Sequence, residues 1–264
     1  MSAILVEHQG PIGIVTLNRP EKHNAFDDTL IGELTATLKS MDSDTAIRVL
    51  VLSSAGKSFS AGADLAWMKR MAACSETDNF RDAMALGELM HTLHSLSKPT
   101  VARVQGAAYG GGVGLIACCD MAIGAYDATF ALSEVRLGLI PAVIGPYVIA
   151  AIGKRQAQRY FLSGERFDAA AAYRIGLLHE IAKDEEELDE RIGNLVESLL
   201  LSAPDAQREG KSLIDAVAFR PITSDMIEDT AHRIARLRVS REGQEGLSAF
   251  LEKRDPGWIP PRAE

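Results

Sequence analysis

The 264-residue sequence lacks the features that mark several specialised classes of protein. Its three cysteines contain no C-x-x-C pair and its six histidines have no ligand spacing, so we expect neither a disulfide framework nor a metal site. It also lacks a basic excess, and a formal net charge of −8 argues against a nucleic-acid partner. No apolar run is long enough to span a membrane and no signal-peptide pattern opens the chain, so we expect a cytoplasmic protein.

Nucleotide-binding fingerprints are missing as well. The run "GGGVG" does not fit G-x-G-x-x-G in its strand-to-helix frame, and no G-x-x-x-x-G-K-[ST] loop occurs. The glycine-rich turns therefore need another explanation.

The hydrophobic pattern predicts an α/β protein. Residues 4–6 and 12–17 alternate like the strands of a hairpin, and Asp27 or Asp28 is placed to cap a helix that runs to about Met41. Short apolar runs alternate with amphipathic segments up to about residue 137, and the rest is almost wholly helical to about residue 253. Further strands are expected at 48–54, 100–106, 121–125 and 128–132, with helices near 66–72, at 81–96 and after 110.

Two glycine-bearing turns are candidates for binding an oxygen. "SAGADL" (60–65) and "GAAYGGGVG" (106–114) each follow a strand and open a helix, whose first N–H groups have no partner in the helix itself. Two such turns side by side aim two donors at one oxygen, the arrangement of an oxyanion hole. The alternative is that each glycine run only makes a tight turn.

A third segment, "ALSEVRLGLIP" (131–141), places Glu134 among apolar neighbours such as Leu132 and Val135. Carboxylates rarely occupy such a position without a partner or a chemical task. A buried carboxyl has a raised pKa, which suits proton transfer near neutral pH. The alternative is a salt bridge with Arg136 or another cation.

Taken in order, these segments resemble the enoyl-CoA hydratase/isomerase (crotonase) superfamily. The motifs that carry the resemblance are "LNRPEKHNAF", "SFSAGADL", "GAAYGGGVGLIACCD", "FALSEVRLGLIPAVIG" and "RYFLSGERFDAAAAYRIGLL". The resemblance implies a spiral of ββα units over residues 1–200 and a C-terminal helical trimerisation region over 201–264. It also implies homotrimers, or hexamers made of two trimers.

The resemblance further implies an acyl-CoA substrate and a set of site residues. The N–H groups of Ala63 and Gly111 are expected to form the oxyanion hole, and Glu134 to be the acid/base. Coenzyme A would be part of the substrate, so neither a separate cofactor nor a metal is expected. The residues expected to contact the substrate are Lys22, Ala25, Ala61, Gly62, Asp64, Leu65, Trp67, Gly110, Gly114, Phe250 and Lys253.

Gly114 departs from the pattern of the family's hydratases, which carry a second glutamate three residues after the oxyanion glycine. Three alternatives follow: an isomerase that shuttles one proton, a hydratase that works with Glu134 alone, or an inactive acyl-CoA-binding scaffold. Finer resemblance, in "SAGADLAWMKRMA" and "ALSEVRLGLIPAVIGPYVIAAIG", favours the second, with 3-methylglutaconyl-CoA or isohexenylglutaconyl-CoA as substrate. Such a hydratase would act on the first of these in leucine breakdown. We expect the missing side chain at Gly114 to make room for the acyl group.

Several side chains keep two interpretations each. A substrate carboxylate could be bound by Lys69, Arg70 or Arg136, each of which could instead lie on the surface. The acyl pocket could be lined by Trp67, Met68 and Met71, which could instead belong to the core. Tyr109 either donates a hydrogen bond or only packs against its neighbours.

Overall fold

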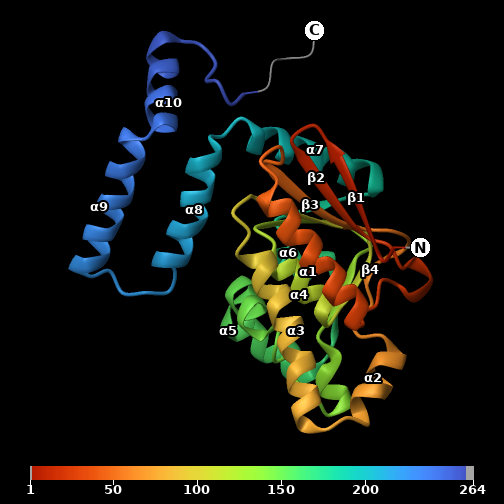
Figure 1. Ribbon diagram of the computed structural model, residues 1–264. Coiled ribbons are helices and arrows are strands. Elements are labelled where there is room, and N and C mark those ends of the chain that lie inside the picture. The colour runs from red at the N-terminus through yellow and green to blue at the C-terminus, as the bar shows by residue number, and fades with distance from the viewer. Residues whose placement is uncertain (1, 260–264) are drawn as a thin grey trace. The chain divides into compact units, whose positions relative to one another are not determined.

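The computed structural model describes residues 2–259, which form two compact units (Figure 1). The first unit contains the residues up to 96 and Thr100–Gly193, and the second contains Ser97–Pro99 and the residues from 194 onward, so the division falls within helix α7 (Glu185–Leu200). Within residues 2–259, no helix combines the length and the apolarity that crossing a bilayer requires.

The larger sheet of the first unit has six strands. Its order is β1 (Ile4–Gln9), β2 (Ile12–Leu17), β3 (Val49–Ser54), β5 (Thr100–Val104), β7 (Met121–Ala125) and β10 (Glu180–Ala182). Strand β1 forms the expected antiparallel hairpin with β2, and all other neighbours are parallel. Every residue of β3 is buried, as expected for a central parallel strand covered on both faces.

The smaller sheet has four strands of three residues each. Its order is β4 (Ser58–Ser60), β6 (Ala107–Tyr109), β8 (Thr129–Ala131) and β9 (Arg166–Asp168), with the first three parallel. The chain passes repeatedly from the larger sheet to the smaller one and then into a helix: β3 leads to β4, β5 to β6 and β7 to β8. This repetition confirms the predicted spiral of ββα units. It also brings the carboxyl ends of β4, β6 and β8 to one edge of the smaller sheet.

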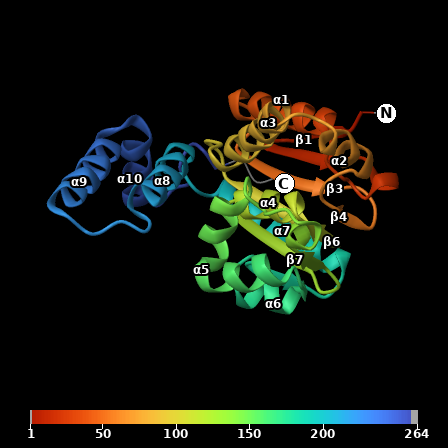
Figure 2. The same cartoon turned by 90° about the horizontal axis from the view of Figure 1, so that it is seen from below.

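The helices of the first unit cover both sheets. Helices α1 (Asp28–Ser43) and α3 (Glu76–His94) lie side by side over the larger sheet (Figure 2). Asp27 is the cap of α1, where it accepts a hydrogen bond from the Leu30 N–H at 2.9 Å. The remaining elements of this unit are η1 (Pro20–Lys22), α2 (Leu65–Ala72), α4 (Gly111–Cys118), η2 (Ser133–Leu137), α5 (Gly145–Ser163) and α6 (Ala169–Arg174).

Several boundaries differ from the prediction for local reasons. Helix α3 begins five residues earlier than expected, at Glu76 rather than 81, because the Ser75 hydroxyl caps it by accepting from the Asp78 N–H at 3.2 Å. The prediction of an almost wholly helical second half was wrong at β9 and β10. Strands of three residues are too short to show the alternation on which a sequence-based assignment depends.

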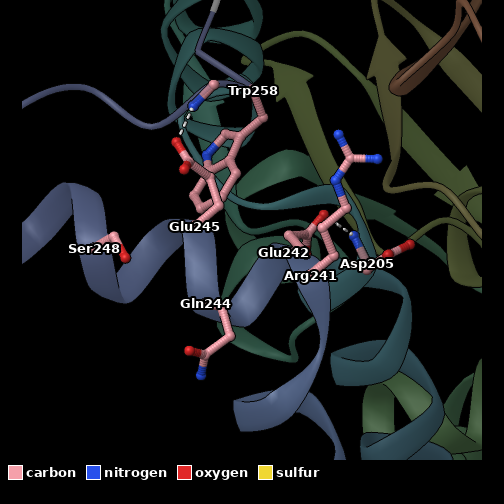
Figure 3. A pocket seen from close by; sticks show the side chains of 8 residues that line it. Asp205, Arg241, Glu242, Gln244, Glu245, Ser248 and Trp258 are labelled. Carbon is pink, nitrogen blue, oxygen red and sulfur yellow. Dashed lines mark hydrogen bonds between the residues drawn. The ribbon is translucent and has the colours of Figure 1, made fainter.

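The second unit contains α8 (Pro204–Val217), α9 (Ser224–Val239) and α10 (Arg241–Glu252). Carboxylates of α10 line a pocket in this unit and hold nearby backbone (Figure 3). Glu242 accepts from the N–H groups that open α8, at 3.0 and 2.9 Å, and Glu245 accepts from the Gly257 N–H at 2.9 Å. Hydrogen bonds from Arg254 are the main cause that lowers the pKa of Glu245 to about 2. These contacts connect the ends of the helices within the unit.

Candidate active site

The three segments singled out in the sequence meet at the edge of the smaller sheet. Residues 61–64 follow β4, residues 110–112 follow β6, and residues 132–134 follow β8. A β-carbon placed on Gly62 would lie 3.1 Å from the carbonyl oxygen of Tyr109, so the first two turns are in direct contact. One placed on Gly110 would lie 2.9 Å from Oε1 of Glu134, so the carboxyl group lies against the second turn.

The three consecutive glycines each meet a different group. Gly110 faces the Glu134 carboxyl group, Gly111 faces the ring of Phe26, and Gly112 faces Ser60. A β-carbon would come within 3.1 Å of the ring at Gly111 and within 2.9 Å of Ser60 at Gly112. Gly110 also has a φ of 50°, a backbone conformation that glycine adopts most easily. The glycine run is thus needed for close approach on several sides.

Within residues 2–259, the N–H groups of Ala63 and Gly111 are among those on these turns that have no partner. Phe26 forms a parallel bridge across Ala63: its N–H donates to the Gly62 carbonyl and its own carbonyl accepts from the Asp64 N–H, both at 2.7 Å. In this geometry the N–H of Ala63 points away from Phe26. Within residues 2–259 neither this N–H nor that of Gly111, the first residue of α4, makes a hydrogen bond. Both groups are therefore available to an acceptor.

The carboxyl group of Asp64 fixes the first turn. Its Oδ1 accepts from the N–H groups of Ala66 and Trp67 at 2.9 and 3.1 Å and caps α2, while Oδ2 lies 3.0 Å from Nζ of Lys22. The hydrogen bond from Trp67, together with that from Lys22, holds the pKa of Asp64 below its usual range. The side chain of Asp64 thus stabilises the turn on which Ala63 lies.

Asn24 attaches the preceding loop to β4. Its fully buried side chain donates to the carbonyls of Ala55 and Ser58, both at 2.8 Å, and accepts from the Arg19 N–H at 2.8 Å. The Ser60 hydroxyl donates to the Asn24 carbonyl at 2.9 Å. With every polar group of this side chain engaged, the loop is held firmly beside the first turn.

Glu134 lies at the start of η2 and forms no ion pair with any other residue in the range 2–259. Its Oε2 is buried and makes no hydrogen bond within the described part of the chain. Burial raises the pKa of this carboxyl group, as the sequence predicted. The alternative of a salt bridge with Arg136 was wrong, because Arg136 Nε is directed to the Ser163 carbonyl at 3.5 Å instead.

The expected room beside Gly114 does not exist. A β-carbon at this position would lie 2.3 Å from Cγ2 of Ile144 and 3.3 Å from the sulfur of Met90. Both neighbours are buried, so Gly114 contributes to close packing between α4 and the start of α5 and not to space for an acyl group. The interpretation of Gly114 as an enlargement of the pocket was therefore wrong.

The ambiguous side chains have these positions in the structure. Trp67 belongs to the core and donates to Oδ1 of Asp82 at 3.0 Å, and Met71 packs against the core. Arg70 pairs with Asp28 at 2.8 Å on the surface. The hydroxyl groups of Tyr109 and Thr129 lie 3.2 Å apart. Any role of these residues in binding a substrate stays a prediction.

The other predicted contact residues are distributed over both units. Ala61, Ala63 and Leu65 are exposed on the first turn, while Gly62 and Ala25 are buried. Phe250 and Lys253 lie in the second unit, where Phe250 is 80% exposed and Lys253 ends α10 with a φ of 57°. No cluster of three His, Cys, Asp or Glu side chains suitable for a metal ion occurs among residues 2–259.

Three residues around the turns were not predicted from the sequence: Phe26, Ser60 and Ile144. Phe26 ends the segment "NRPEKHNAF", which is otherwise largely polar. Its apolar side chain at that position is the local signal that could have indicated a buried residue beside the turns. Nothing near Ile144 in the sequence indicates that it meets Gly114.

Comparison with known proteins places the chain among acyl-CoA enzymes. A family model described as enoyl-CoA hydratase/isomerase matches residues 7–260. A putative enoyl-CoA hydratase from Thermus thermophilus is 33% identical and the alignment covers 94% of this chain and 97% of the relative. The 2,3-dehydroadipyl-CoA hydratase of Escherichia coli is 29% identical, with 98% and 99% covered. A crystal structure of an enoyl-CoA hydratase from Shewanella pealeana is 43% identical, with a TM-score of 0.94 over 97% of this chain and 96% of that one.

The packing at Gly114 predicts the effect of adding one methyl group. We expect Gly114→Ala to destabilise the protein, because the clash with Ile144 outweighs a gain in helix propensity of about 1 kcal/mol. Adding Ile144→Ala should relieve part of the clash, so the double variant should be more stable than the sum of the single effects, measured by denaturant unfolding. Gly32→Ala in α1, where nothing lies within 4 Å, is the matched control and should be stabilising. An equally stabilising Gly114→Ala would refute this account.

The raised pKa of Glu134 predicts a pH-dependent stability difference. An unfolded chain ionises this group near 4.5, whereas the folded chain ionises it at higher pH. The protonated carboxyl group therefore stabilises the folded chain fully at pH values below the pKa of the unfolded chain. This stabilisation is lost as the pH rises through the pKa of the folded chain. Glu134→Gln cannot ionise, so its melting temperature relative to the wild type should increase from about pH 5 to about pH 8. Glu165→Gln is the control, because Arg159 lowers the pKa of Glu165 and the trend should not appear; a flat profile for Glu134→Gln contradicts the prediction.

Proposed function

Because the chain belongs to the enoyl-CoA hydratase/isomerase family, we propose that it hydrates a branched 2-enoyl-CoA with Glu134 as its acid/base. Its relatives are named enoyl-CoA hydratases, and the chain is a hydro-lyase of this type that acts on an acyl-CoA. The substrate we propose is 3-methylglutaconyl-CoA, which would become 3-hydroxy-3-methylglutaryl-CoA. The observation that carries the proposal is a carboxyl group with one buried, unpaired oxygen, which lies against a turn with unpaired N–H groups.

The two N–H groups would act on the thioester. Its carbonyl oxygen would accept from Ala63 and Gly111, whose amides have no other acceptor within residues 2–259. As water adds to Cβ, the electrons of the double bond move toward the carbonyl and negative charge develops on this oxygen. Donors that are already oriented stabilise such charge more than water does, because they need not reorganise. The N-terminal end of α4 adds the positive end of the helix dipole.

Glu134 would move the proton. The ionised carboxylate takes a proton from water while the water oxygen bonds to Cβ, which leaves an enolate. The protonated carboxyl group then returns this proton to Cα, and the thioester is regenerated. Its raised pKa lies closer to neutral pH than that of an ordinary glutamate, so the group can both accept and return the proton more easily.

A single carboxyl group fits the composition of helix α4. Residues 110–114 carry no titratable side chain, and Ile144 occupies the space beside Gly114. Further along the helix, burial raises the pKa of the Cys118 thiol, so that it stays protonated. Glu134 would thus have to serve both proton transfers.

The choice of acyl group rests on the sequence resemblance described above. One relative, the 2,3-dehydroadipyl-CoA hydratase, is named for an acyl chain with a second carboxyl group, which supports an acidic acyl chain here as well. Isohexenylglutaconyl-CoA is the alternative substrate. A single-glutamate isomerase and an inactive acyl-CoA-binding scaffold are the alternative functions.

Coenzyme A would lie along the first turn as part of the substrate, and no further cofactor is proposed. Lys22 supports this position, because its half-exposed ammonium group lies beside the turn and offers a cation to a phosphate. The substrate contacts of Ala25, Ala61, Gly62, Asp64, Leu65 and Gly110 stay predictions. The cytoplasmic location also stays a prediction.

We also expect three copies, or six, to assemble. Phe250 and Lys253 would then lie near the coenzyme of a neighbouring copy, which is consistent with the high exposure of Phe250. Light scattering should give a mass of three or six chains, and a monomer at assay concentration would contradict this expectation.

Steady-state assays on three substrates should identify the reaction. We expect loss of enoyl-thioester absorbance, with the highest kcat/KM for 3-methylglutaconyl-CoA over isohexenylglutaconyl-CoA and crotonyl-CoA. Conversion of a 3-enoyl-CoA to the conjugated form, without hydration, would identify an isomerase, and binding without turnover would identify a scaffold. Glu134→Gln is nearly isosteric and should lower turnover by on the order of 10²-fold or more. Full turnover in this variant would exclude Glu134 as the acid/base.

A further inference from the structure

We propose that Phe26 is a positioning residue that sets the spacing between the two N–H groups of the site. This inference rests on the proposed function, because it assumes that the amides of Ala63 and Gly111 bind one oxygen. Phe26 contacts both turns at once, through its backbone on one side and its ring on the other.

The backbone of Phe26 fixes the first turn. Its N–H donates to the Gly62 carbonyl and its carbonyl accepts from the Asp64 N–H, each at 2.7 Å. These two bonds hold the residues on either side of Ala63 and direct the N–H of Ala63 away from the bridge. Because the bridge uses main-chain atoms alone, it does not depend on the identity of the side chain.

The ring of Phe26 fixes the second turn. Its Cε2, Cδ2 and Cζ atoms would lie 3.1, 3.3 and 3.6 Å from a β-carbon on Gly111, so the ring packs directly against the first residue of α4. The side chain is only 2% exposed and lies within the hydrophobic core. A ring held in this way acts as a spacer between the bridge and the start of α4. Its size therefore determines where the Gly111 N–H lies relative to that of Ala63.

A shorter side chain would separate the function of the Phe26 backbone, which fixes the first turn, from that of its ring, which fixes the second. In Phe26→Leu the bridge and the N–H of Ala63 should stay in place, while the start of α4 moves into the space left by the ring. The matched control is Phe167→Leu in β9. Phe167 is also buried, with its ring centroid 5.5 Å from that of Phe130, and it faces none of the site glycines. Both variants remove the same atoms from the core.

Kinetics separate positioning from general destabilisation. Phe26→Leu should lower kcat by on the order of 10- to 100-fold with a much smaller change in KM. A small displacement of a donor weakens the stabilisation of the transition state more than it weakens the binding of the substrate. Phe167→Leu should keep the wild-type kcat despite a similar loss of melting temperature. If Phe26→Leu fails to fold, Phe26→Met replaces it, with Phe167→Met as its control. Equal kcat values in the two variants would overturn the proposal.

A spectroscopic readout tests the two amides directly. Hydrogen bonds to a thioester carbonyl lower its stretching frequency. This frequency can be measured without turnover by infrared difference spectroscopy on bound butyryl-CoA that carries carbon-13 at the carbonyl. We expect a lowered frequency on the wild type and on Phe167→Leu, and a partial return toward the free value on Phe26→Leu. An unshifted frequency on the wild type would refute the oxyanion hole and hence the proposed function. A shift that Phe26→Leu leaves unchanged would refute the positioning role alone.

Discussion

The site depends on backbone meeting other groups with no side chain in between. Gly62 lies against the carbonyl of Tyr109, Gly110 against the carboxyl group of Glu134, and Gly112 against Ser60, and a β-carbon on any of them would come within 3.1 Å of that group. These contacts arise because β4, β6 and β8 are parallel neighbours that end at one edge. Much of this edge is therefore lined by backbone atoms, and the sequence must supply small residues around them.

Two carboxyl groups on this edge have opposite environments. Asp64 accepts hydrogen bonds from two backbone N–H groups and from Lys22, which lowers its pKa and gives it a structural role in the cap of α2. The carboxyl group of Glu134 is desolvated by burial, which raises its pKa, and its Oε2 makes no hydrogen bond within residues 2–259. A group of the second kind reduces stability in its ionised form, and such a cost is typical of residues retained for chemistry.

Sequence reasoning was reliable where the signal was local. The hairpin, the cap at Asp27, the buried strand β3 and the apolar surroundings of Glu134 are each apparent within a few residues. It failed where two distant segments meet. The space expected beside Gly114 is filled by Ile144, and Arg136, the alternative partner for Glu134, is directed to Ser163 instead. Of the three-residue strands in the smaller sheet, β8 was predicted, whereas β4, β6 and β9 were missed because they are too short to show a periodic pattern.

By itself, the sequence determined the α/β class, the two glycine turns that open helices, and the carboxyl group in an apolar segment, because each depends on residues adjacent along the chain. The tertiary structure decided which group faces each glycine and that Phe26 spans both turns. It also decided that Asp64 caps a helix, while Oε2 of Glu134 has no partner within residues 2–259. The order of the strands brings these atoms together, and strand order follows from packing across the whole unit.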